Sequence, residues 1–181
     1  LKTSVDNGRQ LHILDAIERV NEAQKNVLFE KVARYFGGTA GLSGKTIALW
    51  GLSFKPNTDD MREAPSLVLI RQLLKANCRV QAYDPVARDE ARRILLQEHG
   101  KEVCDKLLTI VDSPWTATQN ADALVLVTEW KEFRAPDFDR LAKARKEKVI
   151  FDGRNVYDPA TVHAAGLSYH GIGRLSKGAL Q

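Results

Sequence analysis

The sequence predicts an α/β fold in which helices cover both faces of a mostly parallel sheet of about six strands. Short apolar segments rich in β-branched residues recur at 45–50, 79–84, 107–111, 123–128 and 148–152, with a weaker one at 167–172. Helix-like segments separate them, and such alternation is typical of parallel sheets with right-handed crossovers. The stretches ALVLV and KVIF are apolar almost throughout, which indicates strands that are covered on both faces.

The helices between these strands are expected at 65–76 and 86–98, with shorter ones at 114–120, 138–146 and 158–165. Together with the strands they predict a Rossmann-like, doubly wound domain over residues 44–181. In such domains ligands bind beyond the carboxyl ends of the strands. The loops that follow the strands are therefore where a site is expected.

A long helix is expected to precede this domain. Neither Pro nor Gly interrupts residues 9–36, and apolar side chains such as Ile17, Leu28 and Val32 recur there at helical spacing. Such a helix would be about 42 Å long, so we expect it to extend beyond the domain. The glycine-rich segment 37–44 predicts the end of the helix and a linker. We therefore divide the chain into a helical part, 1–43, and an α/β part, 44–181.

Composition argues against several classes of protein. The 27 Lys and Arg residues exceed the 23 Asp and Glu residues by a net charge of +4 that is spread along the chain, which indicates a solvated surface rather than a nucleic-acid site. No run approaches the ~18 apolar residues of a membrane span, and no secretory signal is visible. Cys78 and Cys104 lack metal or redox spacing. We expect them to be packing residues or quiet thiols in a cytoplasmic protein without membrane or nucleic-acid partners.

The loop after the first expected strand, GLSFKPNTDDMREAPS (51–66), holds the strongest candidate site residues. It lacks the G-x-G-x-x-G fingerprint, because Phe54 and Lys55 stand where further glycines would be. A side chain must then replace close backbone contacts to a phosphate, which predicts that Lys55 binds an anion and that Phe54 covers a sugar or base. A solvent-exposed lysine beside a core phenylalanine is the alternative that the residues leave open.

Charged residues later in the same loop allow two interpretations. Asp59 and Asp60 could hold a metal, but no His or third acid accompanies them. Capping of the helix expected at 65–76 explains them better, since acids complement a helix N-terminus. Arg62 does not suit that position, because its charge opposes the helix dipole. It is better explained if it reaches an anion, in a bidentate contact.

Two further strand ends carry polar side chains. Asp84 ends the second strand, where an acid binds ribose in NAD-type folds, but it lies farther from Gly51 than the usual ~20 residues, so its role stays open. The segment FDGRNVYDP (151–159) ends the fifth strand with a turn that presents Arg154 at the same sheet edge as Lys55. Two cations on one rim predict a diphosphate or other polyanionic ligand. A surface salt bridge for Arg154 remains the alternative.

The loop 51–66, with YDP (83–85) and FDGRNVYDP (151–159), resembles the C-terminal UDP-binding domain of the UDP-glucose/GDP-mannose dehydrogenase family. The segment ILDAIERVNEAQK (13–25) is similar to the end of that family's central helical domain. The resemblance covers nearly the whole chain in the expected order. Members of the family that act on GDP-mannose or UDP-N-acetylmannosamine match these segments less closely. The segment KPNTDDMREAPS (55–66) favours the UDP-glucose 6-dehydrogenases.

The resemblance implies an NAD-dependent oxidation of UDP-glucose to UDP-glucuronate in two successive steps, through a cysteine-bound thiohemiacetal. It implies that Phe54, Lys55 and Arg154 contact the UDP-sugar and that Arg62 reaches NAD bound mainly by another domain. Asn21 and Gln24 match family positions, to which we assign only packing or interface roles. The family's helical domain forms dimers, so a homodimer through the helical region is expected.

The family's N-terminal NAD domain and its CFPKD-type motif with the nucleophilic cysteine have no counterpart in this sequence. Neither Cys78 nor Cys104 has the surroundings of that motif. We therefore expect no catalytic residue in this chain, and no turnover of UDP-glucose by the chain alone. A free-standing nucleotide-binding module, and a module that mainly mediates assembly, are the alternatives.

Overall fold

Six strands form one parallel sheet in the order β3-β2-β1-β4-β5-β6. The computed structural model describes residues 12–144 and 146–174. Its strands are β1 (Thr46–Trp50), β2 (Arg79–Tyr83), β3 (Leu108–Ile110), β4 (Ala123–Leu126), β5 (Val149–Asp152) and β6 (Ser168–Gly171). This is the strand order of dinucleotide-binding Rossmann folds. The predicted α/β fold class and its six strands are confirmed.

The helices agree with the expected positions, with one difference. They are α2 (His12–Tyr35), the 3-10 turn η1 (Thr39–Leu42), α3 (Pro65–Lys75), α4 (Arg88–Leu107), α5 (Pro114–Thr118), the 3-10 turn η2 (Lys131–Phe133), α6 (Phe138–Ala144) and α7 (Pro159–Ala164). The helix expected at 86–98 ends close to its predicted end, because Gly100, at φ 77°, leaves the helical conformation. A second helical segment, which the sequence analysis did not predict, follows this kink and ends at Leu107.

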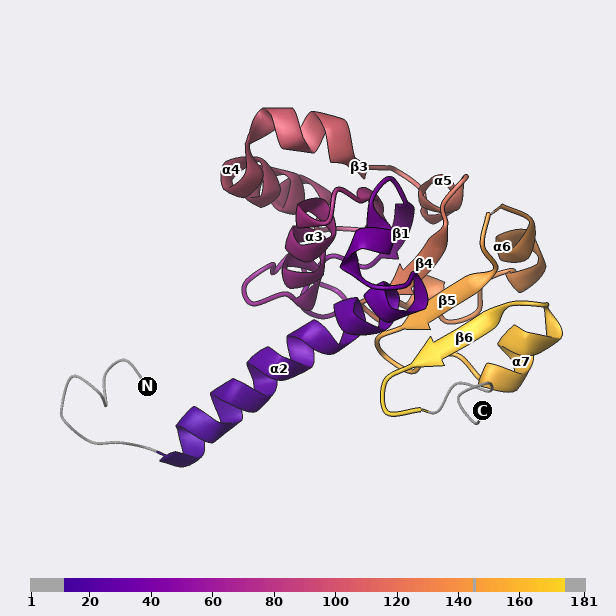
Figure 1. Cartoon of the computed structure of the whole chain (residues 1–181), viewed down its shortest axis with the longest axis horizontal. Helices are drawn as coiled ribbons and strands as arrows, with labels where there is room; N and C mark the ends of the chain where they lie inside the picture. The colour runs from indigo at the N-terminus through magenta and orange to yellow at the C-terminus, as the bar shows by residue number, and fades with distance from the viewer. Residues whose placement is uncertain (1–11, 145, 175–181) are drawn as a thin grey trace.

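Alternate residues of the strands β1, β4 and β5 enter two separate cores, one on each face of the sheet. On one face, Ile47 and Leu49 of β1 pack with buried residues of α2, α3 and α4. On the other, Ala48 and Trp50 pack with buried residues of α5, α6 and α7. Figure 1 shows these helices on both sides of the sheet. The doubly wound arrangement that the sequence predicts is confirmed.

The long helix α2 has a buried half and an exposed half. Leu28, Val32 and Ala33 belong to the first core, on a face of β4 and β5 that no crossover helix covers, because α6 and α7 lie on the opposite face. Toward the other end, Ile17 and Val20 are 48% and 65% exposed, and the helix projects away from the sheet (Figure 1). The predicted extension beyond the domain is confirmed, while residues 9–11 of the expected helix lie outside the described residues.

The segment after α2 is packed rather than free. Residues 37–44, which the sequence predicts to be a linker, contain the turn η1, and Leu42 is fully buried in the first core. An apolar side chain in a core position therefore holds this segment against the sheet, and its role as a linker between domains stays a prediction. The division of the chain at residue 43 stays a prediction.

The end of α2 packs against aromatic rings of β5 and β6. Tyr35 meets Phe151 edge-on with ring centroids 5.6 Å apart, and it meets His170 in the same way at 5.4 Å. Phe151 and His170 are stacked at 5.0 Å. Burial lowers the pKa of His170, and the charges of Lys31 and His163 act in the same direction. This histidine is therefore neutral in the folded chain at pH 7.

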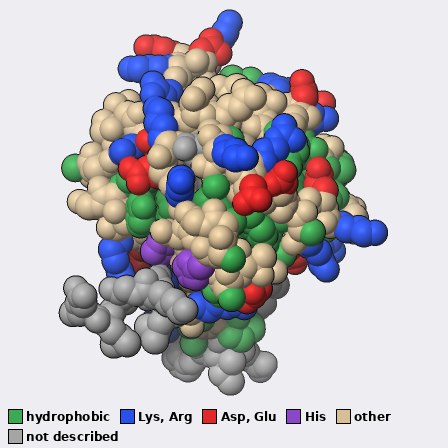
Figure 2. All heavy atoms as spheres, turned by 90° about the vertical axis from the view of Figure 1, so that its right-hand side faces the viewer, with side chains coloured by type: hydrophobic (Ala, Val, Ile, Leu, Met, Phe, Trp, Pro, Cys, Tyr) green, Lys and Arg blue, Asp and Glu red, His purple; other side chains and the backbone are tan. Residues whose placement is uncertain are grey.

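The surface and the thiols agree with the composition. On the face shown in Figure 2, Lys and Arg side chains are interspersed with Asp and Glu rather than gathered in one basic patch. No described helix is both long enough and apolar enough to cross a membrane.

Cys78 and Cys104 are buried and form no disulfide, and burial raises the pKa of Cys78 to about 12. Such a thiol stays protonated at neutral pH, so the prediction of a quiet packing residue is confirmed for Cys78.

Candidate functional site

The strand order reverses between β1 and β4, and the loops that follow these two strands meet at that point. Gly51, at φ 90°, lies directly against Thr128. A Cβ atom on residue 51 would lie 2.5 Å from the Thr128 Cβ, so only glycine permits this approach. In open α/β sheets the crevice beyond such a reversal is the usual place for a ligand. The two loops therefore define where the site is sought.

Asp84 holds the start of the first of these loops from the end of β2. Its side chain is fully buried, and Oδ2 accepts hydrogen bonds from the backbone N–H of Leu52 at 2.7 Å and of Ser53 at 3.1 Å, and from Trp130 Nε1 at 3.0 Å. Oδ1 accepts two amides of the following turn at 2.9 and 2.8 Å. Because both oxygens face donors of the protein, the ribose-binding role that the sequence left open for Asp84 is not supported.

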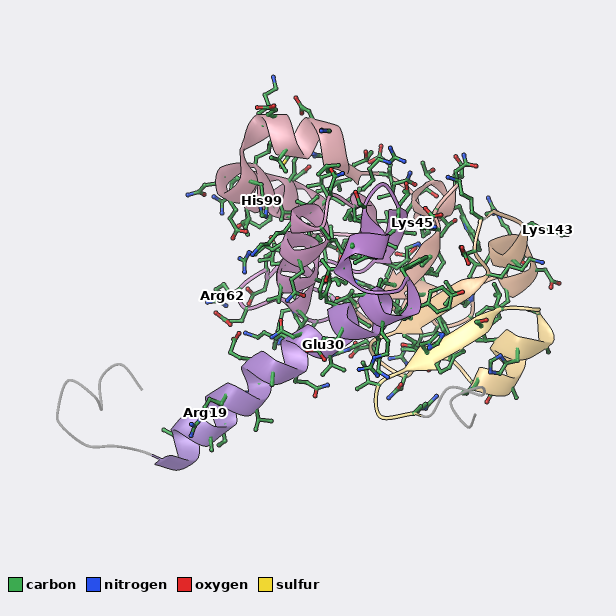
Figure 3. All side chains as sticks on the ribbon, in the orientation of Figure 1. Arg19, Glu30, Lys45, Arg62, His99 and Lys143 are labelled. Carbon is green, nitrogen blue, oxygen red and sulfur yellow. The ribbon has the colours of Figure 1, made fainter. Side chains whose placement is uncertain are left out.

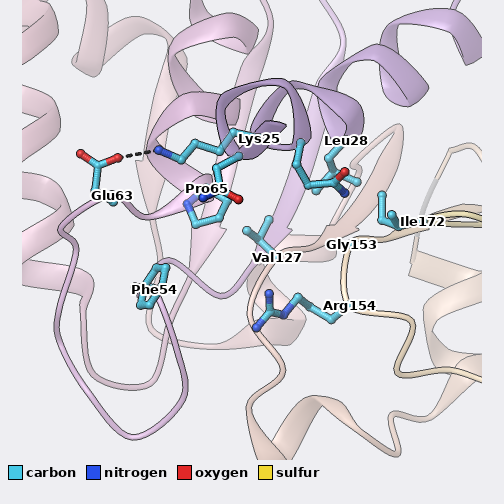
Figure 4. Close-up of a pocket in the computed structure, with 11 residues that line it drawn as sticks. Lys25, Leu28, Phe54, Glu63, Pro65, Val127, Gly153, Arg154 and Ile172 are labelled. Carbon is cyan, nitrogen blue, oxygen red and sulfur yellow. Dashed lines mark hydrogen bonds and ion pairs between the residues drawn. The ribbon is translucent and has the colours of Figure 1, made fainter. Parts of the chain in front are cut away.

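A cavity of about 470 Å³ opens between α2 and the loops that follow β1, β4 and β5 (Figure 4). This volume lies within the range of ~300–1,000 Å³ that is typical of small-molecule sites. Its wall consists of Asn21, Gln24, Lys25, Leu28, Phe54, Glu63, Pro65, Val127, Gly153, Arg154 and Ile172. The structure thus brings together Phe54 and Arg154, which come from the ends of two different strands.

Phe54 and Lys55 are adjacent but differ in their surroundings. Phe54 is 47% exposed and lines the cavity, so it is not the core phenylalanine of the alternative interpretation. Lys55 is exposed beside it and does not belong to the cavity wall. Among the described residues, no carboxylate forms an ion pair with Lys55. Its side chain stays open to solvent, and its charge contributes to lowering the pKa of Asp60.

Arg154 reaches the cavity from a turn built by Asp152. The buried Asp152 accepts the backbone N–H of Arg154 at 3.0 Å, as the turn predicted from the sequence requires. The guanidinium pairs with Glu129 through both Nε and Nη2, with Nη2 lying 2.9 Å from Oε1. The salt bridge that the sequence left open for Arg154 therefore exists, and it lies on the cavity wall. The hydrogen bond from Arg154 lowers the pKa of Glu129.

Arg62 lies in a different place. Its side chain is 89% exposed and lines a second hollow beside α3 and α4, not the cavity of Phe54 and Arg154 (Figure 3). The predicted bidentate contact is present, but its partner is Asp60, with Nε–Oδ1 and Nη2–Oδ2 distances of 2.9 and 2.8 Å. This pairing lowers the pKa of Asp60 to about 2, mainly through the hydrogen bond from Arg62.

The expected capping of α3 by Asp59 and Asp60 is wrong. The N-cap residue is Ala64, which has no side-chain capping bond, and Pro65 occupies the first turn. The loop folds back so that the Phe54 N–H donates to the Asp60 carbonyl at 2.8 Å. This path directs the Asp60 carboxylate toward Arg62 instead of the helix.

Helix α2 contributes a wall that the sequence analysis did not assign to a site. Asn21, Gln24 and Lys25 line the cavity at successive helical positions that continue into the buried Leu28. Lys25 also bonds to Glu63 of the first loop at 2.5 Å, which ties the helix to that loop (Figure 4). The signal that could have revealed this wall is the i, i+3, i+4 spacing of polar residues along the row that is buried farther on.

Two features of a dinucleotide site are missing among the described residues. The loop after β1 lacks the second and third glycines of the fingerprint, and Asp84 is committed to protein donors. Residues 12–144 and 146–174 also contain no group of three His, Cys, Asp or Glu side chains suited to hold a metal ion. The cavity wall instead combines the guanidinium of Arg154 with apolar side chains such as Phe54 and Leu28.

A model of the UDP-glucose/GDP-mannose dehydrogenase family, UDP binding domain, matches residues 48–159. The chain belongs to this family. Over 174 residues it is 45% identical to the UDP-glucose 6-dehydrogenase of Pseudomonas aeruginosa and 37% identical to that of Rhizobium meliloti. Each alignment covers 96% of this chain and 37% of the relative. The family resemblance of the loop 51–66 is confirmed, and the chain spans little more than a third of the length of these relatives.

A solved structure supports the same assignment. The UDP-glucose dehydrogenase of Pyrobaculum islandicum superimposes with a TM-score of 0.75 at 28% identity. The superposition covers 96% of this chain and 35% of that protein. Helix α2 and the sheet therefore occur together in a dehydrogenase of this family.

Proposed function

We propose that this chain supplies the UDP-binding part of an NAD-dependent UDP-glucose 6-dehydrogenase. The observation that carries the proposal is the cavity at the strand-order reversal, where Phe54 and Arg154 line one wall in a member of this family. In this proposal Arg154 binds the diphosphate of UDP-glucose and Lys55 adds a second positive charge. Phe54 covers the uracil or the sugar with its ring.

The chemistry of these side chains suits a nucleotide diphosphate. A guanidinium presents paired N–H donors that match phosphate oxygens, and a lysine ammonium acts as a point charge. The apolar part of the wall, which includes Leu28, Val127 and Ile172, suits the flat face of a base. In this proposal the chain provides only part of the substrate pocket, so we expect it alone to bind UDP with modest affinity.

The oxidation itself requires groups that the described residues do not provide. UDP-glucose is oxidised twice at C6 to UDP-glucuronate, and NAD accepts the hydride in each step. Cys78 is buried with its pKa raised to about 12, so it is no nucleophile. We propose that the chain binds and orients the nucleotide, while a thiol and an NAD-binding part come from elsewhere. Arg62, exposed beside α3, would then reach the NAD.

Assembly through α2 belongs to the same proposal. Leu14, Ile17 and Val20 on the projecting half of α2 are exposed apolar side chains. A homodimer that buries them would explain why this half of the helix carries them.

A titration of the 181-residue chain with UDP tests the site. We expect weak binding that falls about 10-fold or more in Arg154→Ala, because charge-assisted hydrogen bonds contribute ~1.5–3 kcal/mol. Lys55→Ala should weaken binding as well. Lys143→Ala is the matched control, since Lys143 is an exposed cation on α6, far from the cavity (Figure 3). Unchanged affinity in both site variants would remove this assignment.

Two further measurements distinguish the proposed function from its alternatives. GDP in place of UDP should bind more weakly, and equal or tighter binding of GDP would favour a GDP-sugar enzyme. The chain alone should produce no NADH from UDP-glucose and NAD. Detectable NADH production would show that the 181-residue chain suffices for catalysis.

A further inference from the structure

We propose that Glu129 is a positioning residue for nucleotide binding, which holds one edge of the Arg154 guanidinium so that the opposite edge faces the cavity. This rests on the proposed function, because the free edge is assigned to the diphosphate of the nucleotide. Glu129 itself makes no contact with the ligand in this proposal. Its effect on binding is exerted through Arg154.

One edge of the Arg154 guanidinium remains available to bind a ligand. An arginine side chain carries five N–H donors arranged along two edges, one formed by Nε and Nη2 and the other by Nη1 and Nη2. Glu129 occupies the first edge, with Nη2 at 2.9 Å from Oε1 and Nε bonded to Oε2. For Nη1, no hydrogen-bond partner is found within the described residues. Figure 4 shows the guanidinium directed into the space between Phe54 and Val127. A phosphate can therefore bind the second edge while Glu129 stays in place.

The backbone of Glu129 is held on both sides. Thr128, 1% exposed, donates its hydroxyl to the Ser53 carbonyl at 2.6 Å. Trp130, 7% exposed, donates its indole N–H to Asp84 at 3.0 Å. An ordinary surface ion pair gains little because two mobile side chains must be ordered. Here Glu129 lies on a short segment that is held in place at both neighbouring residues. Folding therefore already offsets much of the entropic cost of ordering Glu129.

Two opposing effects act on a bound diphosphate. The carboxylate of Glu129 orients Arg154, which saves the cost of ordering a long side chain when the ligand binds. Its negative charge also repels the phosphates. Glu129→Ala removes both effects, whereas Glu129→Gln removes the charge but keeps one acceptor oxygen, which can still bind one of the two Arg154 N–H groups. If orientation dominates, as we propose, the two variants differ in their affinity for UDP.

The test is an NMR titration of the ¹⁵N-labelled chain with UDP and, separately, with uridine, which lacks the phosphates. We expect Glu129→Ala to bind UDP about 3- to 10-fold more weakly than the wild type, the cost of ordering one long side chain. Glu129→Gln should bind UDP more tightly than Glu129→Ala. Uridine should bind both variants as it binds the wild type. The Arg154 Nε–H signal of the wild type should stay in its hydrogen-bonded position when UDP saturates the site.

The matched control is Glu98→Ala. Glu98 forms the same kind of bidentate pair, with Arg71 Nε and Nη2 at 2.8 and 2.6 Å, between α3 and α4. Its removal should leave UDP affinity unchanged. Thermal unfolding of each variant shows whether the fold is retained, as we expect because both glutamate side chains are only partly buried.

The outcomes separate this inference from the function on which it rests. UDP affinity in Glu129→Ala equal to or above that of the wild type would overturn the positioning role, since Glu129 would then be only a competitor. An equal loss for uridine would also overturn it, because the effect would not pass through the phosphates. Loss of binding in Arg154→Ala together with no change in Glu129→Ala would refute this inference alone. Absence of UDP binding by the wild-type chain would refute the proposed function and this inference together.

Discussion

Replacing Asp84 by asparagine tests how the loop that carries Phe54 is held in place. Asp84 is fully buried, and its two oxygens accept hydrogen bonds from backbone amides on both sides and from Trp130. Asparagine has nearly the same shape but presents an NH₂ group in place of one oxygen. Whichever way the amide is turned, that NH₂ faces at least two N–H donors and can accept from neither.

The expected loss of stability follows from the number of donors left without a partner. Each buried polar group in that state costs about 1–3 kcal/mol, so two such donors lower the free energy of unfolding by about 2–6 kcal/mol. For a protein of this size, Tm falls by about 2–4 °C per kcal/mol, which predicts a decrease of roughly 5–20 °C. Since Leu52 and Ser53 begin the loop that ends in the cavity, affinity for UDP should fall as well.

Urea unfolding followed by circular dichroism measures the effect. Asp89→Asn is the control, because its side chain is 98% exposed and pairs with Arg92 one turn away on α4. That substitution should change the unfolding free energy by less than about 0.5 kcal/mol. If Asp84→Asn were also within about 1 kcal/mol of the wild type, the assignment of Asp84 as a buried acceptor for these donors would be wrong.

Three further predictions concern other parts of the fold. Gly51→Ala should lower the free energy of unfolding by at least about 2 kcal/mol, because residue 51 has φ 90° and its Cβ would lie 2.6 Å from the Thr128 nitrogen; an unchanged urea midpoint would contradict that close approach. The pKa of His170 is lowered by burial, so below about pH 6.5 the unfolded chain binds a proton before the folded chain does, and stability should decrease from pH 7 toward pH 5. His170→Gln should weaken this pH dependence of the urea midpoint, and an identical profile would argue against burial as its cause. The thiol of Cys78, with a pKa of about 12, should resist thiol reagents at pH 8 in the native chain and react once urea unfolds it; rapid labelling of the native chain would refute its burial.

The strands and most of the helices could be predicted because their signals are local. Apolar runs covered on both faces mark strands such as β4 and β5, and the alternation of strands with helices limits the topology to few arrangements. The sequence analysis missed the second part of α4, which follows Gly100. Gly100 takes a positive φ and ends the first helical segment, but the chain becomes helical again beyond it.

The charged loop shows where local signals were not enough. Asp59 and Asp60 stand at the right distance from Pro65 to cap a helix, yet the path of the backbone turns Asp60 toward Arg62. At this spacing an aspartate can either cap the helix or pair with a nearby arginine. The direction of its side chain decides between the two, and spacing along the chain does not determine that direction.

By itself, the sequence determined the fold class, the family and the placement of Phe54, Lys55 and Arg154 at the ends of two strands. These could be predicted because hydrophobic periodicity and sequence motifs are properties of residues close together in the chain. Only the tertiary structure decided that Arg154 meets Glu129, that Asp84 is fully used by the protein, and that Asn21 and Gln24 line the cavity with Lys25. These contacts join segments that are far apart in the chain. A hydrogen bond requires its two atoms to lie within about 3 Å, and that distance is set by the pairing of strands in the sheet and the packing of helices on it.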